Sequence, residues 1–311
     1  MKIVFNKLQT SKETIQVSLD GGATWNSYVV SEIINDGIPL DENQEYDKIH
    51  IKGSATVLKN LDVVKSIEIH ESNNTKDEMF THDGISFYDN LVNVKIPEGF
   101  TSIGNYAFCV CSSLTSIDLP EGLTSIGDFA FYGCSSLTSI DLPEGLTGIG
   151  YGTFQSCTSL TSIDLPENLT SIGNSAFQYC KSLTSITIPD SVTTIDNFAF
   201  NGCSNLTSID LPENLTSIGS DAFSDFTSLT SIDLPEGLTS IGHYAFSDCT
   251  SLTSIDLPEG LTSIGSHAFE DCKSLKTINF KGTEDQWNAI TKFSNWGKNC
   301  PSDMVINYQG E

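Results

Sequence analysis

Apolar residues recur along most of this chain with a period of 23 residues, and Leu114–Ser136 is a clear copy of the pattern. Eight tandem copies run from Leu91 to Ser274, after which the pattern stops. A unit this short cannot bury its apolar side chains alone, so neighbouring copies must stack to close a common core. The period therefore predicts a solenoid in which residues 91–274 form eight coils.

Each copy begins with two short stretches in which apolar and polar residues alternate. In residues 114–119 the Leu and Ile side chains are expected to face the core from a strand, which Pro120 ends. Leu123 and Ile126 are expected to face the core from a second segment. Between the two segments, the place of Gly122 is taken elsewhere only by Gly, Asn or Ser, which predicts a left-handed backbone. Strands of successive coils are expected to pair in a parallel sheet.

The last part of each copy carries Ala, Phe and Cys. Ala130, Phe131 and Cys134 have the spacing of a single helical turn whose apolar side faces the core. Phe occupies its place in all eight copies, from Phe108 to Phe269, and predicts a stack of rings along the core. The fold class expected from these elements is an α/β solenoid that is mostly β.

Residues 1–45 lie outside the period and predict a small β-hairpin module. Thr14–Leu19 and Thr24–Val30 can form two antiparallel strands around an Asp-Gly-Gly turn. The stretch Ser18–Trp25 resembles the Asp-box turn of sialidases and other propeller proteins, where it is a folding element. It occurs once here, and no pair of carboxylates can be located beside it. We therefore interpret it as a structural hairpin and not as part of a glycosidase site.

Two further segments are predicted to cap the array, because an ideal end coil would leave its apolar side open to water. Residues 46–90 keep the apolar spacing in a degraded form and are expected to form irregular N-terminal capping coils. Residues 275–311 are expected to form a C-terminal cap. In it, a helix over 284–292 begins with a capping box, carries Trp287 over the end of the core, and precedes a last strand over 304–308.

The charge of the chain narrows the class of partner. Lys and Arg together number 15 against 40 acidic residues, giving a net charge of −25. Such a surface repels a polyanion, so a nucleic-acid partner is not expected, whereas a cationic partner or a divalent ion is compatible with it. No run of about 20 apolar residues suits a transmembrane segment, and the first ten residues are too polar for a signal peptide.

Seven of the nine cysteines occupy one place of the repeat and form a column along the array. The column contains Cys111, Cys134, Cys157, Cys180, Cys203, Cys249 and Cys272. Phe226 takes the remaining place, which a disulfide partner could not do but a core side chain can. We therefore interpret the column as buried, unpaired thiols, in preference to a disulfide framework. Cys109 and Cys300 are expected to lie outside the column.

The repeat carries Ile-x-Leu-Pro in its first half, Ile-Gly-x-x-Ala-Phe in its second half and Cys near its end. It resembles the BspA-like leucine-rich repeat family over residues 91–274, and Lys281–Trp287 resembles that family's terminal cap. The resemblance implies a right-handed leucine-rich-repeat array with a parallel sheet. It also implies a surface or secreted protein of host-associated bacteria or protozoa that adheres to host matrix proteins or to cells, with no common catalytic residues.

An acidic residue faces outward from the first predicted strand in six copies. These residues are Asp118, Asp141, Asp164, Asp210, Asp233 and Asp256. A solvated acidic face that keeps the array soluble would explain them. The alternative is a track for Ca²⁺, which prefers oxygen ligands, or for a basic partner. His243 and His267 fall in adjacent copies, but two imidazoles without a third ligand do not predict a zinc site.

The copies differ most in the two residues before Ala and the two residues after Phe. Aromatic residues gather in these places, at Tyr106, Phe129, Tyr132, Tyr151, Tyr179, Phe198 and Tyr244. Later copies carry Asp or Glu there, so the strip grades from aromatic to acidic. Aromatic side chains anchor many protein interfaces and can stack on sugars. This strip is the candidate binding surface, and the alternative is sequence drift where packing imposes no constraint.

Two functions remain open at this point. The first is a non-enzymatic binding or adhesion scaffold that presents the acidic strand face and the variable strip to a protein or glycan. The second is a structural component of a surface or virion-type assembly, docked through the module of residues 1–45. No enzyme is expected, because the chain shows no nucleophile–base arrangement, phosphate-binding loop or dinucleotide fingerprint. The oligomeric state stays open.

Overall fold

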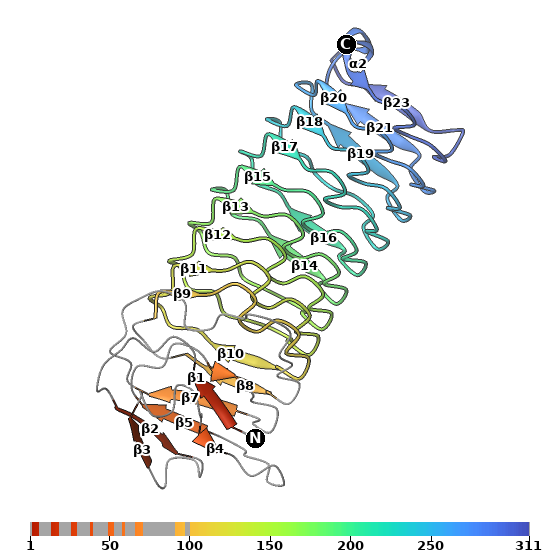
Figure 1. Cartoon of the computed structure of the whole chain (residues 1–311). Helices are drawn as coiled ribbons and strands as arrows, with labels where there is room; N and C mark the ends of the chain where they lie inside the picture. Colours follow the sequence, from red (N-terminus) through yellow and green to blue (C-terminus); the bar gives the residue numbers. More distant parts are fainter. Residues whose placement is uncertain are drawn as a thin grey trace. The chain divides into compact units, whose positions relative to one another are not determined.

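The computed structural model describes residues 91–96 and 100–310, together with the backbone of seven earlier strands. It divides into two compact units, residues 1–146 and 147–311. Figure 1 labels strands of each unit. The division falls inside the run of eight repeats. Each unit is built from stacked solenoid turns with parallel strands, as the period predicted.

The first unit contains a six-stranded sheet that begins with the predicted hairpin. In spatial order its strands are β10 (Ser116–Asp118), β8 (Asn93–Lys95), β7 (Ser66–His70), β5 (Ile49–Lys52), β2 (Thr14–Ser18) and β3 (Asn26–Val29). β2 and β3 are antiparallel, which confirms the hairpin. The register pairs Ile49 with Ile67, Ile67 with Val94 and Val94 with Ile117, so parallel strand pairing continues from the capping strands into the repeats. The turn of the Asp-box lies outside the described residues.

Strands from either side of residue 45 pair with one another. β1 (Lys2–Phe5) is antiparallel to β4 (Ile38–Pro39) and to β6 (Leu58–Lys59). β2 likewise pairs with β5. The hairpin module and the capping strands therefore share their sheets.

The second unit carries two ladders of short strands. One ladder is continuous over seven parallel strands: β12 (Gly148–Ile149), β13 (Ser171–Ile172), β15 (Thr194–Ile195), β17 (Ser217–Ile218), β18 (Ser240–Ile241), β20 (Ser263–Ile264) and β22 (Thr291–Lys292). Its counterpart in the first unit is β9 (Ser102–Ile103) with β11 (Ser125–Ile126). These strands confirm the second segment expected at Leu123 and Ile126.

The other ladder of the second unit is interrupted. It consists of β14 (Ser185–Thr187) with β16 (Ser208–Asp210), and of β19 (Ser254–Leu257), β21 (Thr277–Phe280) and β23 (Val305–Tyr308). Between the two groups, residues 231–234 keep only one bridge, from Asp233 to Asp256. No strand pairing joins β16 to residues 231–234 within the described part of this unit. Asp210, Asp233 and Asp256 of the acidic column lie on this interrupted ladder.

The expected single helical turn at Ala130, Phe131 and Cys134 is wrong, although all three side chains are fully buried. The chain instead makes a succession of β-turns, and two residues in each solenoid turn, four positions apart, have a left-handed backbone. These pairs are 106/110, 129/133, 152/156, 175/179, 198/202, 221/225, 244/248, 267/271 and 295/299. A helical turn requires negative φ throughout, so these residues exclude it.

Hydrogen bonds explain why the left-handed pairs recur. In residues 173–180, the amides of Ser175, Phe177 and Tyr179 donate to carbonyls of the next solenoid turn, at 2.7 to 3.0 Å. The alternate amides donate to the residue three positions earlier, at 3.1 to 3.2 Å. Successive N–H groups thus point in alternate directions and all find acceptors. The third side of each turn is therefore as fully hydrogen-bonded as a strand.

The glycines of the repeat serve a different purpose from the one expected. Gly122 is not left-handed, so that prediction is wrong. Gly242 and Gly265 occupy a different place of the repeat, that of Gly127, where neighbouring turns approach closely. A Cβ on Gly242 would lie 2.6 Å from the backbone of Gly219, and one on Gly265 would lie 2.4 Å from the backbone of Gly242. Close backbone contact, and not positive φ, selects glycine at this place.

All nine cysteines are free thiols, which confirms the interpretation of the column as unpaired. Five thiols of the column each donate to the carbonyl of the column Phe one solenoid turn earlier. The recorded distances run from 3.0 to 3.3 Å for Cys134, Cys180, Cys203, Cys249 and Cys272. Cys300 donates to Phe269 at 3.1 Å in the same way, so placing Cys300 outside the column was wrong.

The repeat pattern continues past Ser274, contrary to expectation, with a spacing of 28 residues in place of 23. The helix α2 (Glu284–Ala289) accounts for the added length, and Thr283 and Gln286 form its predicted capping box. The helix ends before the expected residue 292 because Thr291–Lys292 pairs with β20 as strand β22. Trp287 is buried, as predicted. The C-terminal cap is thus a further solenoid turn with a helix inserted into it.

The Phe rings stack through the core as predicted. In the second unit, successive column rings lie 5.3 to 5.5 Å apart, except that Phe200 and Phe223 are separated by 5.9 Å. Phe226, the residue that replaces Cys, packs against Phe223 at 5.6 Å and needs this additional room.

Replacement of one ring should destabilise the array. Phe200 is fully buried and stacks on Phe177 and Phe223. We expect Phe200→Ala to lower the free energy of unfolding by about 3 to 5 kcal/mol, because the hydrogen-bonded turns cannot move together to fill the cavity that the ring leaves. Calorimetric melting of the variant measures this effect, and a melting temperature equal to that of the wild type would contradict it.

The thiols should be nearly inert in the folded protein. Burial raises the pKa of Cys109 to about 11 and the pKa values of Cys203 and Cys300 to about 12. We expect a thiol reagent at pH 8 to modify at most the half-buried Cys109 and Cys300, and to modify nine thiols after unfolding. Rapid modification of the column thiols in the native state would contradict the structure.

The same pKa shifts give the direction of an alkaline effect. Unfolded thiols ionise near 9, whereas the folded thiols remain protonated up to about 11 or 12. Stability contributed by the buried neutral thiols should therefore be complete below pH 9 and decline as the pH rises from 9 to 12. Melting temperatures measured across this range, with Cys203→Ala as the comparison, test the sign.

Candidate binding surface

The left-handed positions coincide with two of the four variable places of the repeat. Tyr106, Phe129, Tyr179, Phe198 and Tyr244 all have φ between 55° and 61°. The amides of Tyr106, Tyr179, Phe198 and Tyr244 donate to the next solenoid turn; that of Tyr106, for example, donates to the Asp128 carbonyl at 2.9 Å. The backbone that carries these rings is therefore fixed, and their side chains project from the third side of the solenoid turn.

In the first unit, the structure brings three of the predicted site residues together. The rings of Tyr106 and Phe129 stack with centroids 5.0 Å apart and planes 14° from parallel. Phe129 meets Tyr132 edge-on at 5.9 Å. Tyr106 is exposed, while Phe129 and Tyr132 are half-buried. These three rings form one aromatic cluster, which we call the Tyr106 cluster.

In the second unit, the predicted aromatic residues lie apart from one another. Their exposed fractions are 45% for Tyr151, 41% for Tyr179, 36% for Phe198 and 38% for Tyr244. Tyr179 covers the left-handed Gly202, where a Cβ would lie 2.5 Å from the ring. Tyr244 stacks on His267 at 4.7 Å. Tyr179 and Tyr244 thus pack against separate neighbours, and no stacked pair comparable to Tyr106 and Phe129 is recorded among the predicted aromatic residues in the described part of this unit.

A ladder of polar side chains occupies one of the variable places, and sequence reasoning missed it. Gln155 donates to Gln178 at 2.5 Å, Gln178 donates to Asn201 at 2.8 Å, and Asn201 donates to Ser224 at 2.6 Å. The members are buried or half-buried. The recurrence of amide and hydroxyl side chains at intervals of 23 residues is the sequence signal that could have predicted this ladder. This place of the repeat is structural in these turns, which narrows the surface left for a partner.

The acidic end of the strip is partly buried. Burial raises the pKa of Asp221, and burial together with the charge of Asp248 raises that of Asp225. Glu270 has the opposite shift, because hydrogen bonds from Lys298 and His267 lower its pKa. His267 Nδ1 lies 2.7 Å from the Glu270 carboxylate.

Neither of the two neighbouring histidines points to a metal. His243 accepts a hydrogen bond from the Ser266 amide at 2.8 Å, and His267 pairs with Glu270. Across residues 91–96 and 100–310, no group of three or more His, Cys, Asp or Glu side chains is arranged to hold a metal ion. Calcium binding by the acidic column stays a prediction.

The residues of the acidic column are mostly exposed to solvent. Asp118, Asp141, Asp164, Asp210 and Asp233 are exposed, and Asp256 is half-buried. Polar residues that break the column hydrogen-bond to its members: Thr187 lies 3.4 Å from Asp210, and Asn279 donates to Asp256 at 2.7 Å. Lys281 forms an ion pair with Glu236, beside the column.

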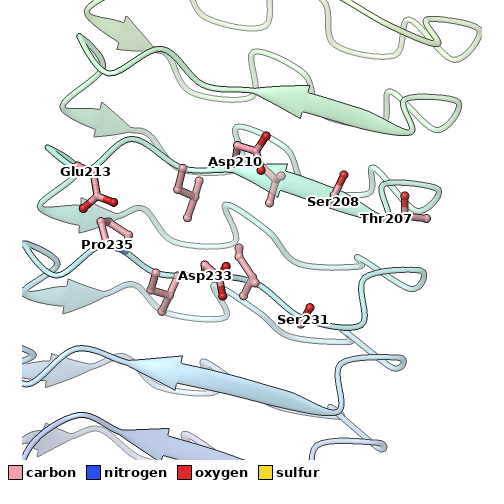
Figure 2. Close-up of a pocket in the computed structure, with 11 residues that line it drawn as sticks. Thr207, Ser208, Asp210, Glu213, Ser231, Asp233 and Pro235 are labelled. Atoms are coloured by element: carbon pink, nitrogen blue, oxygen red, sulfur yellow. The ribbon is translucent and has the colours of Figure 1, made fainter.

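A groove of about 350 Å³ opens in the second unit where the ladder is interrupted. It lies between residues 207–213, which contain β16, and residues 231–235 of the next turn. Figure 2 shows Asp210 and Glu213 on one border and Asp233 on the other. Hydroxyls of Thr207, Ser208 and Ser231 line the rest of its polar wall. The groove thus places three carboxylates around a space large enough for a side chain.

Comparison with known proteins identifies the repeat. The family model described as "BspA type Leucine rich repeat region" matches residues 83–185 and 170–295. The chain belongs to this family. The match extends past Ser274, in agreement with the additional turn that contains α2. No match was found among curated proteins.

Several solved structures are similar to this chain. A leucine-rich repeat protein from Bacteroides ovatus is 26% identical with a TM-score of 0.63, over 87% of this chain and 69% of that protein. A Treponema pallidum leucine-rich repeat protein is 26% identical with a TM-score of 0.44, over 76% of this chain and 86% of that one. A leucine-rich cell surface protein from Faecalibacterium prausnitzii is 23% identical with a TM-score of 0.43, over 81% and 95%. Within the described residues, no helix has the length and apolar character needed to cross a membrane.

Proposed function

We propose that this chain is a non-enzymatic binding scaffold of a cell surface, which holds a protein or glycan partner through the aromatic residues of its left-handed turns. The observation that carries the proposal is the Tyr106 cluster, in which rings of adjacent turns stack at the surface of the first unit. Membership of the BspA-type family supports a binding role, and surface display is proposed on the same ground.

The physical advantage of this arrangement is preorganisation. Tyr and Trp are frequent energetic anchors because they bury a large area and lose little conformational freedom on binding. Tyr106 and Phe129 have fixed backbones and restrict each other's rings by stacking. A partner that covers them would therefore order few groups, which leaves more of the contact energy available as affinity.

The acidic strand face would influence which partners approach. Its exposed carboxylates repel polyanions and attract cationic surfaces, mainly at low ionic strength. The face therefore favours partners with basic patches, whereas the aromatic residues supply the contact itself.

The edge strand β3 supports a second candidate, a structural component of a surface or virion-type assembly. β3 is the last strand of its six-stranded sheet, and a free sheet edge can accept a strand from another chain. Deleting residues 1–45 would remove β2 from its partner β5, so this deletion would also alter the sheet. Loss of assembly at an unchanged melting temperature of the remainder would support docking.

The test of the proposed function replaces Tyr106 and Phe129 together by Asn. Asn tolerates a left-handed backbone and already occupies the equivalent position at Asn295, so the substitution removes the rings without straining the turn. Binding is measured against a panel of immobilised matrix proteins and glycans. We expect the wild type to bind at least one of them and the double variant to bind it at least tenfold more weakly.

The matched control is Val110→Asn. Val110 is also left-handed and lies in the same turn, and Asn299 is its counterpart in the last turn. This variant should bind as the wild type does. Undiminished binding by the double variant, or no binding by the wild type to any member of the panel, would contradict the proposal.

A further inference from the structure

Lys281 provides an internal example of how this acidic face holds an ammonium group. Its side chain forms an ion pair with Glu236, which lies 45 residues earlier. This ion pair raises the pKa of Lys281, and the charges of Asp256 and Asp233 add to the effect. One carboxylate from the turn after the strand is thus in contact with the lysine, and the charges of two residues of the acidic column also act on it.

The 23-residue period places the same three carboxylates one solenoid turn earlier. Subtracting 23 from Glu236, Asp233 and Asp256 gives Glu213, Asp210 and Asp233, and all three line the groove (Figure 2). The position that corresponds to Lys281 is residue 258, which is Pro and carries no charge. Within the described residues, no Lys forms an ion pair with Asp210 or Glu213, whose exposed side chains border the groove.

The groove also has room that a fully paired sheet would remove. β16 forms no strand pairing with residues 231–234, and a volume of about 350 Å³ opens between them. The hydroxyls of Ser208 and Ser231 flank this space and can accept hydrogen bonds from a donor with several N–H groups. An ammonium group is such a donor, and its alkyl stem can lie along Ile209 and Leu234 at the base of the groove.

We propose that the groove bordered by Asp210, Glu213 and Asp233 binds the side-chain ammonium of a lysine on a partner protein. This inference rests on the proposed binding function and assigns the partner chemistry of the acidic strand face. The site reproduces, one turn earlier, the arrangement that holds the chain's own Lys281. Two turns before the groove the set is incomplete, because Thr187 stands in place of an acidic residue beside Asp164 and Glu167.

The experiment follows amide chemical shifts of the full chain, in low salt, on titration with acetyl-Ser-Lys-Ser-amide. The comparison peptide carries acetyl-lysine, which keeps the length and removes the charge. We expect millimolar binding of the lysine peptide, with shifts concentrated at Ser208–Asp210 and Ser231–Asp233, and at least fivefold weaker binding of the acetylated peptide. Equal binding of the two peptides would overturn the proposal.

Two double variants separate the groove from the general charge of the face. D210N/E213Q removes two carboxylates of the groove and should weaken the binding of the lysine peptide at least fivefold. D164N/E167Q removes two carboxylates from the same columns of the same unit, where the set is incomplete, and should weaken it less than twofold. Equal losses in both variants would show diffuse attraction and would overturn the proposal. Asp233 is left unchanged because it also faces Lys281.

A third variant tests the correspondence between the two sites. Lys281→Ala should expose the set Glu236, Asp233 and Asp256, so the peptide should gain a second site with shifts at Ser254–Leu257. Absence of this second site would contradict the correspondence on which the proposal rests. Because the peptide lacks aromatic-binding groups, a negative result leaves the test of Tyr106 and Phe129 unaffected, and the two proposals can fail separately.

Discussion

Hydrogen bonds between adjacent solenoid turns on the side of the left-handed residues are the constraint on which the rest of the structure depends. In residues 152–271 every second amide of the left-handed segments, such as those of Ser175 and Phe177, donates to the following turn. This spacing brings the backbones so close that a Cβ on Gly265 would lie 2.4 Å from Gly242. It also sets the distance of about 5.4 Å between stacked Phe rings and lets each Cys reach a carbonyl of the turn before it. The spacing between turns therefore determines which residues fit the core, namely Gly at the close contact and Phe and Cys in their columns.

The same constraint divides the repeat into residues that hold the fold and residues that a partner can meet. Leu, Ile, Ala, Phe and Cys fill the space between turns and are almost invariant in this chain. The left-handed places require only that the side chain tolerate positive φ, and Tyr, Phe, Ser, Asp, His, Asn and Gly all occur there. Variation is therefore concentrated on a rigid backbone. A scaffold built in this way can change its partner without changing its core.

The sequence predicted most of the buried positions and the strands, because each is repeated eight times, and comparison of the copies shows which positions are apolar throughout. It did not predict the left-handed pairs, since the spacing of Ala130, Phe131 and Cys134 suits a helical turn as well as a run of β-turns. Cys300 was misplaced because the residues of α2 shift it out of the period. The groove at Asp210 could not be predicted, because it depends on where strand pairing is interrupted. The polar ladder from Gln155 to Ser224 left a readable signal in its column.

Hydrogen exchange of the amides in the left-handed segments tests the central claim most directly. These segments contain neither helix nor strand, so an ordinary loop would exchange within minutes. The structure instead predicts that Phe177 and Phe200, which donate to the next turn at 2.7 and 3.0 Å, exchange as slowly as Gly173, whose amide donates within the continuous strand ladder at 2.9 Å. Exchange of Phe177 and Phe200 at the rate of an unprotected peptide would contradict the account.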